Sequence, residues 1–319
     1  MCEMHREEKG MSTKEELESA RWYAPFGHSL AYNSFNQHFT ELNRMYWSHH
    51  PIAVRLKKDT RSLAANGKVP LDYFIVHDED DRKLESSFEE WENWYENFNN
   101  FNRLNIVVAL CSCLEVYMRS IVSFAIESKP GVLIGLKDSA DGARLLKSNL
   151  KKYTYSSKSY PYSRQIREIC QGTWLSRMEN YGELFQNVPT VIKNRISELD
   201  SLRKLRNSIA HNYSRDGSLG FHVPITFDQS PSVRLSHRKL IKYMDLVNQV
   251  VHAIDDHLYN EYIGSYELLK YYTVLCPSEV QRKYISIKSE WLKSYMGDKH
   301  IRQEKKSYYT SLLEYYDNL

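Results

Sequence analysis

The sequence predicts an all-α protein. Glycine occurs 12 times and proline nine times in 319 residues, so few positions favour turns and long helices are expected. The apolar residues recur mainly at three- and four-residue steps, which is the spacing of one helix face. A chain of this length is expected to form about two domains with buried cores.

The first predicted region, residues 1–85, is mostly helical. The helical pattern extends from about Thr13 to Leu63, with loops near Pro25 and Pro51. The run "LDYFIV", residues 71–76, is typical of a short strand. The acidic run "HDEDDRKLESSFEE", residues 77–90, either separates this region from the next or is a solvated loop within one domain.

Two apolar stripes follow on one long helical stretch. The first is aromatic, which is typical of a core or a subunit interface, and consists of Phe88, Trp91, Trp94, Tyr95, Phe98 and Phe101. The second consists of Leu104, Val107, Cys111, Leu114, Met118, Ile121 and Ala125, and "KPG" ends it. This stretch is long enough to span a bilayer, but Glu115 and Arg119 interrupt it. We therefore expect the central helix of a soluble bundle, with no membrane contact.

Residues 137–168 form a basic insert with no acidic side chain between Asp141 and Glu168. Basic groups interleaved with tyrosines are the combination expected for single-stranded nucleic acid, because cations follow the phosphates and rings stack on bases. A solvated basic loop is the alternative. The predicted RNA-binding residues are Lys147, Lys151, Lys152, Tyr153, Tyr155, Lys158, Arg164 and Arg167.

The remaining elements are also helical. A helix from about Tyr181 restarts near Pro189 and continues to His211, and at most a short β-hairpin follows it. Ser236 is predicted to cap the next helix, and the tail, residues 264–319, holds further helices broken at "CPSE" and "MGDK".

The stretch "LRNSIAHNYSR", residues 205–215, carries the candidate chemistry. Asn207 and His211 lie four residues apart and therefore on one helix face. Arg206 is about 100° round the helix, but its long side chain can reach the same cleft, and Arg203 and Lys204 extend the polar edge one turn back. The alternative is an ordinary helix C-terminus, where His211 complements the helix dipole and Arg206 pairs with a carboxylate.

"RNSIAHNY" resembles the RX4-6H motif of the HEPN superfamily, in the Arg-Asn-x-x-x-His-x-Tyr form of HEPN toxins encoded beside nucleotidyltransferase antitoxins. The resemblance covers roughly residues 88–262. It implies an up-and-down helical bundle with the motif at the end of a late helix. It also implies that "ALCSCLEVYMRSIV" is the first long helix, whose Glu115 approaches the motif. Residues 86–263 are thus predicted to be a HEPN-like domain, with helical extensions at 1–85 and 264–319.

The resemblance implies a metal-independent endoribonuclease without cofactor, acting on single-stranded or looped RNA in prokaryotic defence or toxicity. Cleavage by the 2′-hydroxyl needs a base, an acid and positive charge on the phosphate. His211 can serve as base or acid, Arg206 can hold two phosphate oxygens, and Asn207 can orient the phosphate or the imidazole. Because one motif supplies one histidine, we expect a homodimer with a composite site. Tyr213 is predicted to contact RNA or to be the site of a silencing modification by a partner.

Composition limits the alternatives. A net charge of +3 creates no global basic field, so any RNA surface is local. Five scattered cysteines without a CxxC pair indicate neither a disulfide framework nor a zinc site, which favours the cytoplasm. The second hypothesis is a non-catalytic HEPN-like module that binds RNA or nucleotide, or acts as a protein-interaction subunit with an antitoxin or regulatory partner. A purely structural helical scaffold is the third.

Overall fold

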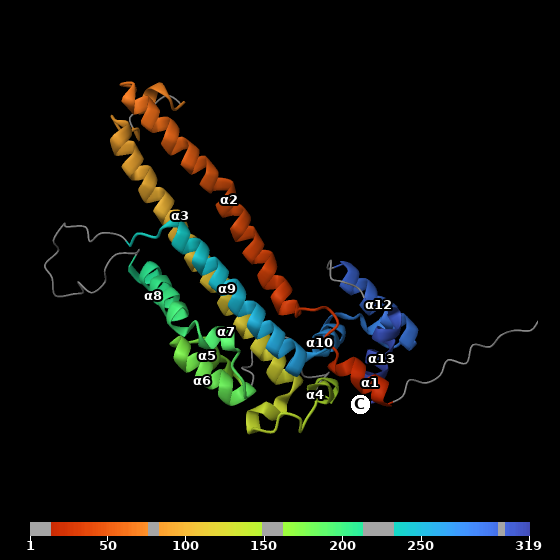
Figure 1. Ribbon diagram of the computed structural model, residues 1–319. Coiled ribbons are helices and arrows are strands. Elements are labelled where there is room, and N and C mark those ends of the chain that lie inside the picture. The colour runs from red at the N-terminus through yellow and green to blue at the C-terminus, as the bar shows by residue number, and fades with distance from the viewer. Residues whose placement is uncertain (1–13, 76–82, 149–161, 213–232, 299–303) are drawn as a thin grey trace, which may run out of the picture. The chain divides into compact units, whose positions relative to one another are not determined.

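The computed structural model describes residues 14–75, 83–148, 162–212, 233–298 and 304–319. Within these ranges all regular structure is helical (Figure 1), which confirms the all-α prediction. The α-helices are α1 (Lys14–Trp22), α2 (Leu30–Ala65), α3 (Phe88–Ser128), α4 (Gly142–Ser148), α5 (Ser163–Cys170), α6 (Trp174–Phe185), α7 (Thr190–Lys193), α8 (Ile196–Asn212), α9 (His237–Leu258), α10 (Tyr266–Leu275), α11 (Ser278–Gln281), α12 (Ile285–Asp298) and α13 (Lys306–Asp317). Short turns of other helix types are η1 (Pro70–Asp72), η3 (Pro130–Ile134) and η5 (Tyr259–Ile263).

The chain divides into two compact units. Unit 1 comprises Met1–Asn33, Tyr117–Lys193 and Val251–Leu319, and unit 2 comprises Ser34–Val116 and Asn194–Val250. Three of the four unit boundaries fall inside the long helices α2, α3 and α9, and the fourth falls between α7 and α8. The predicted division into residues 1–85, 86–263 and 264–319 stays a prediction.

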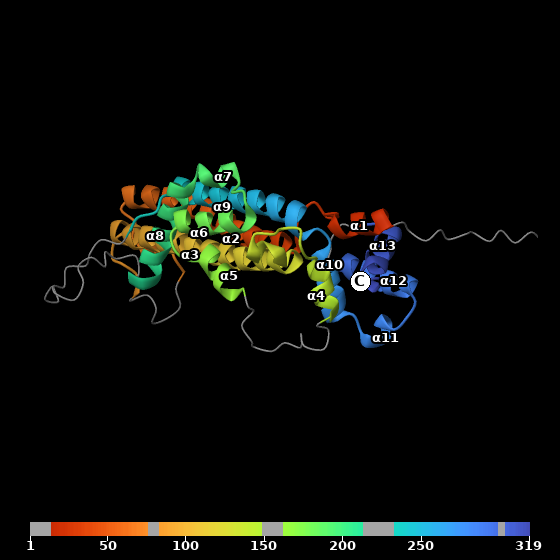
Figure 2. The same cartoon turned by 90° about the horizontal axis from the view of Figure 1, so that it is seen from below.

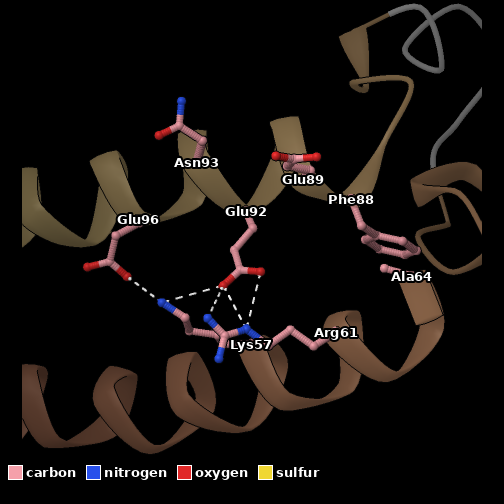
Figure 3. A pocket seen from close by; sticks show the side chains of 8 residues that line it. All are labelled: Lys57, Arg61, Ala64, Phe88, Glu89, Glu92, Asn93 and Glu96. Carbon is pink, nitrogen blue, oxygen red and sulfur yellow. Dashed lines mark hydrogen bonds and ion pairs between the residues drawn. The ribbon is translucent and has the colours of Figure 1, made fainter.

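Helices α2 and α3 run antiparallel in unit 2 and are joined by ion pairs. Lys57 Nζ lies 3.5 Å from Glu92 Oε1 and 3.5 Å from Glu96 Oε2, and Arg61 Nη2 lies 3.0 Å from Glu92 Oε1. These residues line a cavity of about 410 Å³ between the two helices (Figure 3). Because Glu89 adds a third carboxylate against two cations, this cavity does not suit a phosphate.

The second apolar stripe of α3 is buried along its whole length, as predicted. Its seven residues, from Leu104 to Ala125, are each no more than 7% exposed. By length and composition α3 could cross a membrane, since its most apolar 18-residue window has a mean hydropathy of 1.7, and 44% of that window is buried inside the protein. The core helix of a soluble protein meets the same criteria, so this observation does not favour a membrane span by itself.

The aromatic stripe of α3 divides into buried and exposed parts. Phe88 is buried, whereas Trp94, Phe98 and Phe101 are each more than half exposed. The stripe was predicted to pack in a core or in a subunit interface. Core packing is observed for Phe88, at the start of the stripe, but not for the three exposed rings. The three exposed rings share one helix face because they lie four and three residues apart.

The predicted break near Pro189 and the helix that carries the motif are confirmed, whereas α6 begins at Trp174, before the predicted start at about Tyr181. The chain breaks around Pro189, where the short helix α7 separates α6 from α8. Ser236 caps α9 as predicted, because its Oγ accepts a 3.2 Å hydrogen bond from the Lys239 backbone N–H. In the tail, Cys276 and Pro277 separate α10 from α11.

Two local predictions are wrong. Pro51 lies inside α2 rather than in a loop; the missing backbone hydrogen bond is tolerated because α2 packs on both sides of it, with Tyr46 buried against His237 and Thr60 fully buried. Over residues 71–75 the expected strand is replaced by η1, where Pro70 restricts φ and the Asp72 carboxylate accepts the Val69 N–H at 3.0 Å. The predicted β-hairpin lies mostly outside the described residues.

In unit 1 the N- and C-terminal segments share a buried polar centre. Arg21 of α1 is fully buried and donates to Asp141 Oδ1 and Ser128 Oγ, both at 2.8 Å. Tyr315 of α13 donates to Asp141 Oδ2 at 2.6 Å. Figure 2 shows α1, α4 and α10 to α13 gathered in this part of unit 1.

Candidate functional site

Helix α8 positions the Arg206 motif through its buried leucines. Leu199 and Leu202 are buried, and Arg206 follows them at the next helical repeat on the same face. Leu205 and Ile209 of the same helix are half-buried. The stripe that anchors α8 therefore leads directly to the Arg206 side chain.

Arg206 meets one carboxylate and one amide. Its Nη2 lies 3.6 Å from Glu115 Oε2 of α3, and the two side chains are 28% and 30% exposed. Its Nη1 donates to Asn207 Oδ1 at 3.2 Å, while its Nε is buried with no partner among the described residues. The guanidinium is thus oriented from two sides and still partly open to solvent.

The histidine of the motif follows one turn after Asn207 on the same continuous helix. Helix α8 extends to Asn212, so Asn207 and His211 are four residues apart in regular α-helix. The placement of the His211 side chain is not described, and Tyr213 lies outside the described residues. Because Asn207 Oδ1 is engaged by Arg206, its amide Nδ2 is the group left to donate elsewhere.

Arg203 and Lys204 are engaged within α8. Arg203 Nε donates to Asp200 Oδ1 at 2.7 Å, and Lys204 Nζ lies 3.5 Å from Asp200 Oδ2. The hydrogen bond with Asp200 raises the pKa of Arg203. Both predicted supporting residues therefore pair with the Asp200 carboxylate, so neither is an unpaired cation available to a phosphate.

A family model described as RiboL-PSP-HEPN matches residues 82–260. The chain belongs to this HEPN family. The matched range includes Glu115, Arg206 and His211, the residues that the resemblance had indicated. Comparisons with curated proteins and with solved structures found no match.

The HEPN match also spans the basic insert, whose described residues lie in unit 1. Lys147 donates from Nζ to the Asp317 carbonyl at 2.7 Å, Arg164 pairs with Glu168 at 2.8 Å, and Arg167 is exposed. The other predicted RNA-binding residues lie outside the described residues; they are Lys151, Lys152, Tyr153, Tyr155 and Lys158. Of these three cations, Lys147 and Arg164 thus already have an oxygen partner within the protein.

A histidine group in unit 2 of the HEPN chain was not foreseen. The rings of His50 and His237 stack with centroids 4.0 Å apart and an interplanar angle of 6°, and Tyr46 Oη bonds to His237 Nδ1. Burial and the neighbouring His237 lower the pKa of His50. His50 of α2 and His237 of α9 lie 187 positions apart in the sequence (237 minus 50), so no local sequence pattern could predict their contact.

Two further features of the HEPN chain were missed. Four exposed basic residues lie in the first turns of α9 and just before it. The sequence carried a signal for them, because no acidic residue occurs between Ser230 and Asp245. In unit 1 Asp255 and Glu267 are buried carboxylates. Within the described part of the chain, no group of three or more His, Cys, Asp or Glu side chains is arranged to hold a metal ion.

Proposed function

We propose that this protein is a metal-independent endoribonuclease that cleaves single-stranded or looped RNA. The observation that carries the proposal is the Arg206 guanidinium, held by Glu115 and Asn207 one turn before His211 at the end of α8. A guanidinium with a free edge can bind two phosphate oxygens. Membership in the HEPN family supports placing this chemistry at the motif.

The proposed reaction is attack by the 2′-hydroxyl on the adjacent phosphate. A base removes the 2′-hydroxyl proton, the 2′-oxygen bonds to phosphorus, and the bond to the 5′-oxygen breaks as an acid protonates that oxygen. Arg206 stabilises the charge that develops on the phosphate, and His211 carries a proton in one of the two transfers. Unpaired RNA is the expected substrate, because a helical duplex restrains its backbone and hides base edges.

The second proton-transfer group comes from a second copy in this proposal. A two-fold homodimer that brings two α8 C-termini together supplies two histidines to one groove. The exposed rings of Trp94, Phe98 and Phe101 support association, since three neighbouring aromatic side chains on one helix face are unusual on a monomer surface.

The decisive experiment is cleavage of an unstructured RNA in the presence of EDTA. Wild-type protein is expected to cut it and leave a 2′,3′-cyclic phosphate, and His211→Ala and Arg206→Ala are each expected to lose activity by at least about 100-fold. Arg195→Ala is the matched control, because Arg195 precedes α8 and pairs with Glu198 at 2.8 Å. RNA binding without any cleavage by the wild type would instead support a non-catalytic HEPN module.

A further inference from the structure

The first turns of α9 and the segment just before it carry an exposed group of cations in unit 2. This α9 basic patch consists of Arg234, Arg238, Lys239 and Lys242. Arg238 and Lys242 are four residues apart on one face, which places them about 6 Å apart along the helix axis. Lys239 lies over the Tyr243 ring, 4.7 Å from its centroid.

The patch differs from the other basic residues of unit 2, many of which are neutralised locally. Lys57, Arg61 and Arg103 pair with glutamates of α3, and Arg203 and Lys204 pair with Asp200. Among the described residues no carboxylate lies within ion-pair distance of the four patch residues. The positive end of the α9 dipole adds to their charge. This surface is therefore electrostatically suited to a polyanion.

A partly exposed aromatic ring lies at the start of α9, in contact with its first residue, His237. Trp47 of α2 is 46% exposed, and its ring centroid lies 5.6 Å from that of His237 and 5.7 Å from that of His50. His237 immediately precedes Arg238. The indole thus contacts the stacked His50–His237 pair at the start of α9, one residue before Arg238 in the chain, and part of the indole is open to solvent.

We propose that the α9 basic patch and Trp47 bind single-stranded RNA, with the cations on its phosphates and the indole stacked on a base. Cations beside an exposed ring match the two recurring parts of single-strand binding sites, and a duplex would offer no unstacked base to the ring. The proposal rests on the proposed function only for the choice of RNA. It adds a site where the strand is held, separate from the residues that cut it.

The phosphate contacts are tested by the salt dependence of binding. The probe is a fluorescent 2′-O-methyl oligouridylate of about 12 nucleotides, which the nuclease cannot cut because its 2′-oxygens are methylated. In Arg238→Gln/Lys242→Gln the slope of log affinity against log salt is expected to fall by roughly 1.4, about 0.7 for each lost phosphate contact. Arg282→Gln/Lys283→Gln removes the same charge from two exposed residues of unit 1 and is expected to leave the slope unchanged.

The stacking contact is tested by removing the Trp47 ring and, as a control, the exposed ring of Tyr284. Trp47→Leu is expected to weaken oligouridylate binding by at least about fivefold without changing the salt slope, because stacking involves no counterion release. Tyr284→Leu removes an exposed aromatic ring of unit 1, which has no part in the proposed site, and is expected to bind like the wild type. Circular dichroism of each variant checks that helix content is retained.

The outcomes separate this site from the nuclease proposal. Equal loss of affinity in the α9 and control charge variants, or in the Trp47 and Tyr284 variants, overturns the site. If the α9 variant also cleaves RNA with an unchanged KM, the nuclease stands and the site falls. If no form of the protein cleaves RNA while the α9 variant alone loses binding, the nuclease fails and the site stands.

Discussion

Arg206 of α8 and Glu115 of α3 form an ion pair in unit 2, with Nη2 and Oε2 3.6 Å apart and both side chains about 30% exposed. Solvent screens such a pair, so it contributes at most about 1 kcal/mol to stability. A carboxylate at this distance nevertheless orients the guanidinium, and in the proposed reaction it would compete with the incoming phosphate. The pair therefore contributes little to holding α3 and α8 together, which agrees with the role proposed for Arg206.

Arg206→Gln is accordingly expected to separate activity from stability. Its free energy of unfolding should change by no more than about 1 kcal/mol, while RNA cleavage falls by at least about 100-fold. Urea unfolding and a cleavage assay on the same preparation check this expectation. A loss of several kcal/mol would show that the pair is structural and would weaken the nuclease proposal.

Asn207→Asp tests whether the Nδ2 donor of Asn207 is needed for RNA cleavage. The new carboxylate would still accept the Arg206 N–H that Asn207 Oδ1 accepts at 3.2 Å, but it would lack the Nδ2 donor and add a negative charge beside the phosphate. Cleavage is expected to fall by at least about tenfold through a higher KM. Activity equal to that of the wild type would remove Asn207 from the proposed site.

Glu267 is expected to make stability fall as pH rises. Burial raises its pKa from 4.5 to about 8, although its Oε2 accepts the Leu30 N–H at 2.7 Å. Between these two pKa values the folded protein keeps a proton that the unfolded chain has released, so the free energy of unfolding decreases by about 1.4 kcal/mol for each increase of one in pH. This stabilisation is present in full below about pH 4.5 and lost near pH 8.

Glu267→Gln isolates that contribution. Glutamine keeps an acceptor for Leu30 and does not titrate, so urea unfolding at about pH 5 and pH 8 should show a smaller decline than in the wild type. Burial also raises the pKa of Asp255, which adds a decline of the same sign to both proteins. Parallel pH profiles would mean that Glu267 is ionised in the folded state.

Asp141→Asn is expected to destabilise unit 1 strongly. It would leave the fully buried Arg21 without its counter-charge, 2.8 Å away in the wild type, at a cost of about 3–5 kcal/mol in unfolding free energy. Asp59→Asn is the control, because Arg55 in that pair is 76% exposed and a loss below about 1 kcal/mol is expected. Similar losses in the two variants would contradict a special role for the buried pair.

Local patterns allowed much of the fold to be predicted. The apolar steps from Leu104 to Ala125 identified the buried face of α3, and Ser236 identified the start of α9, because both signals act within one or two helical turns. Pro51 was misjudged because its helix is stabilised by packing outside the local sequence. The exposed basic residues at the start of α9 could have been predicted from the absence of acidic residues between Ser230 and Asp245, but the longer basic insert was the stronger signal.

The sequence by itself determined the all-helical class, the order of Arg206, Asn207 and His211 on one helix, and the family motif they form. Only the tertiary structure decided that Glu115 meets Arg206, that His50 stacks on His237, and that Tyr315 reaches Asp141. The physical reason is range: helix periodicity links residues three or four apart, whereas these contacts depend on how separate helices pack.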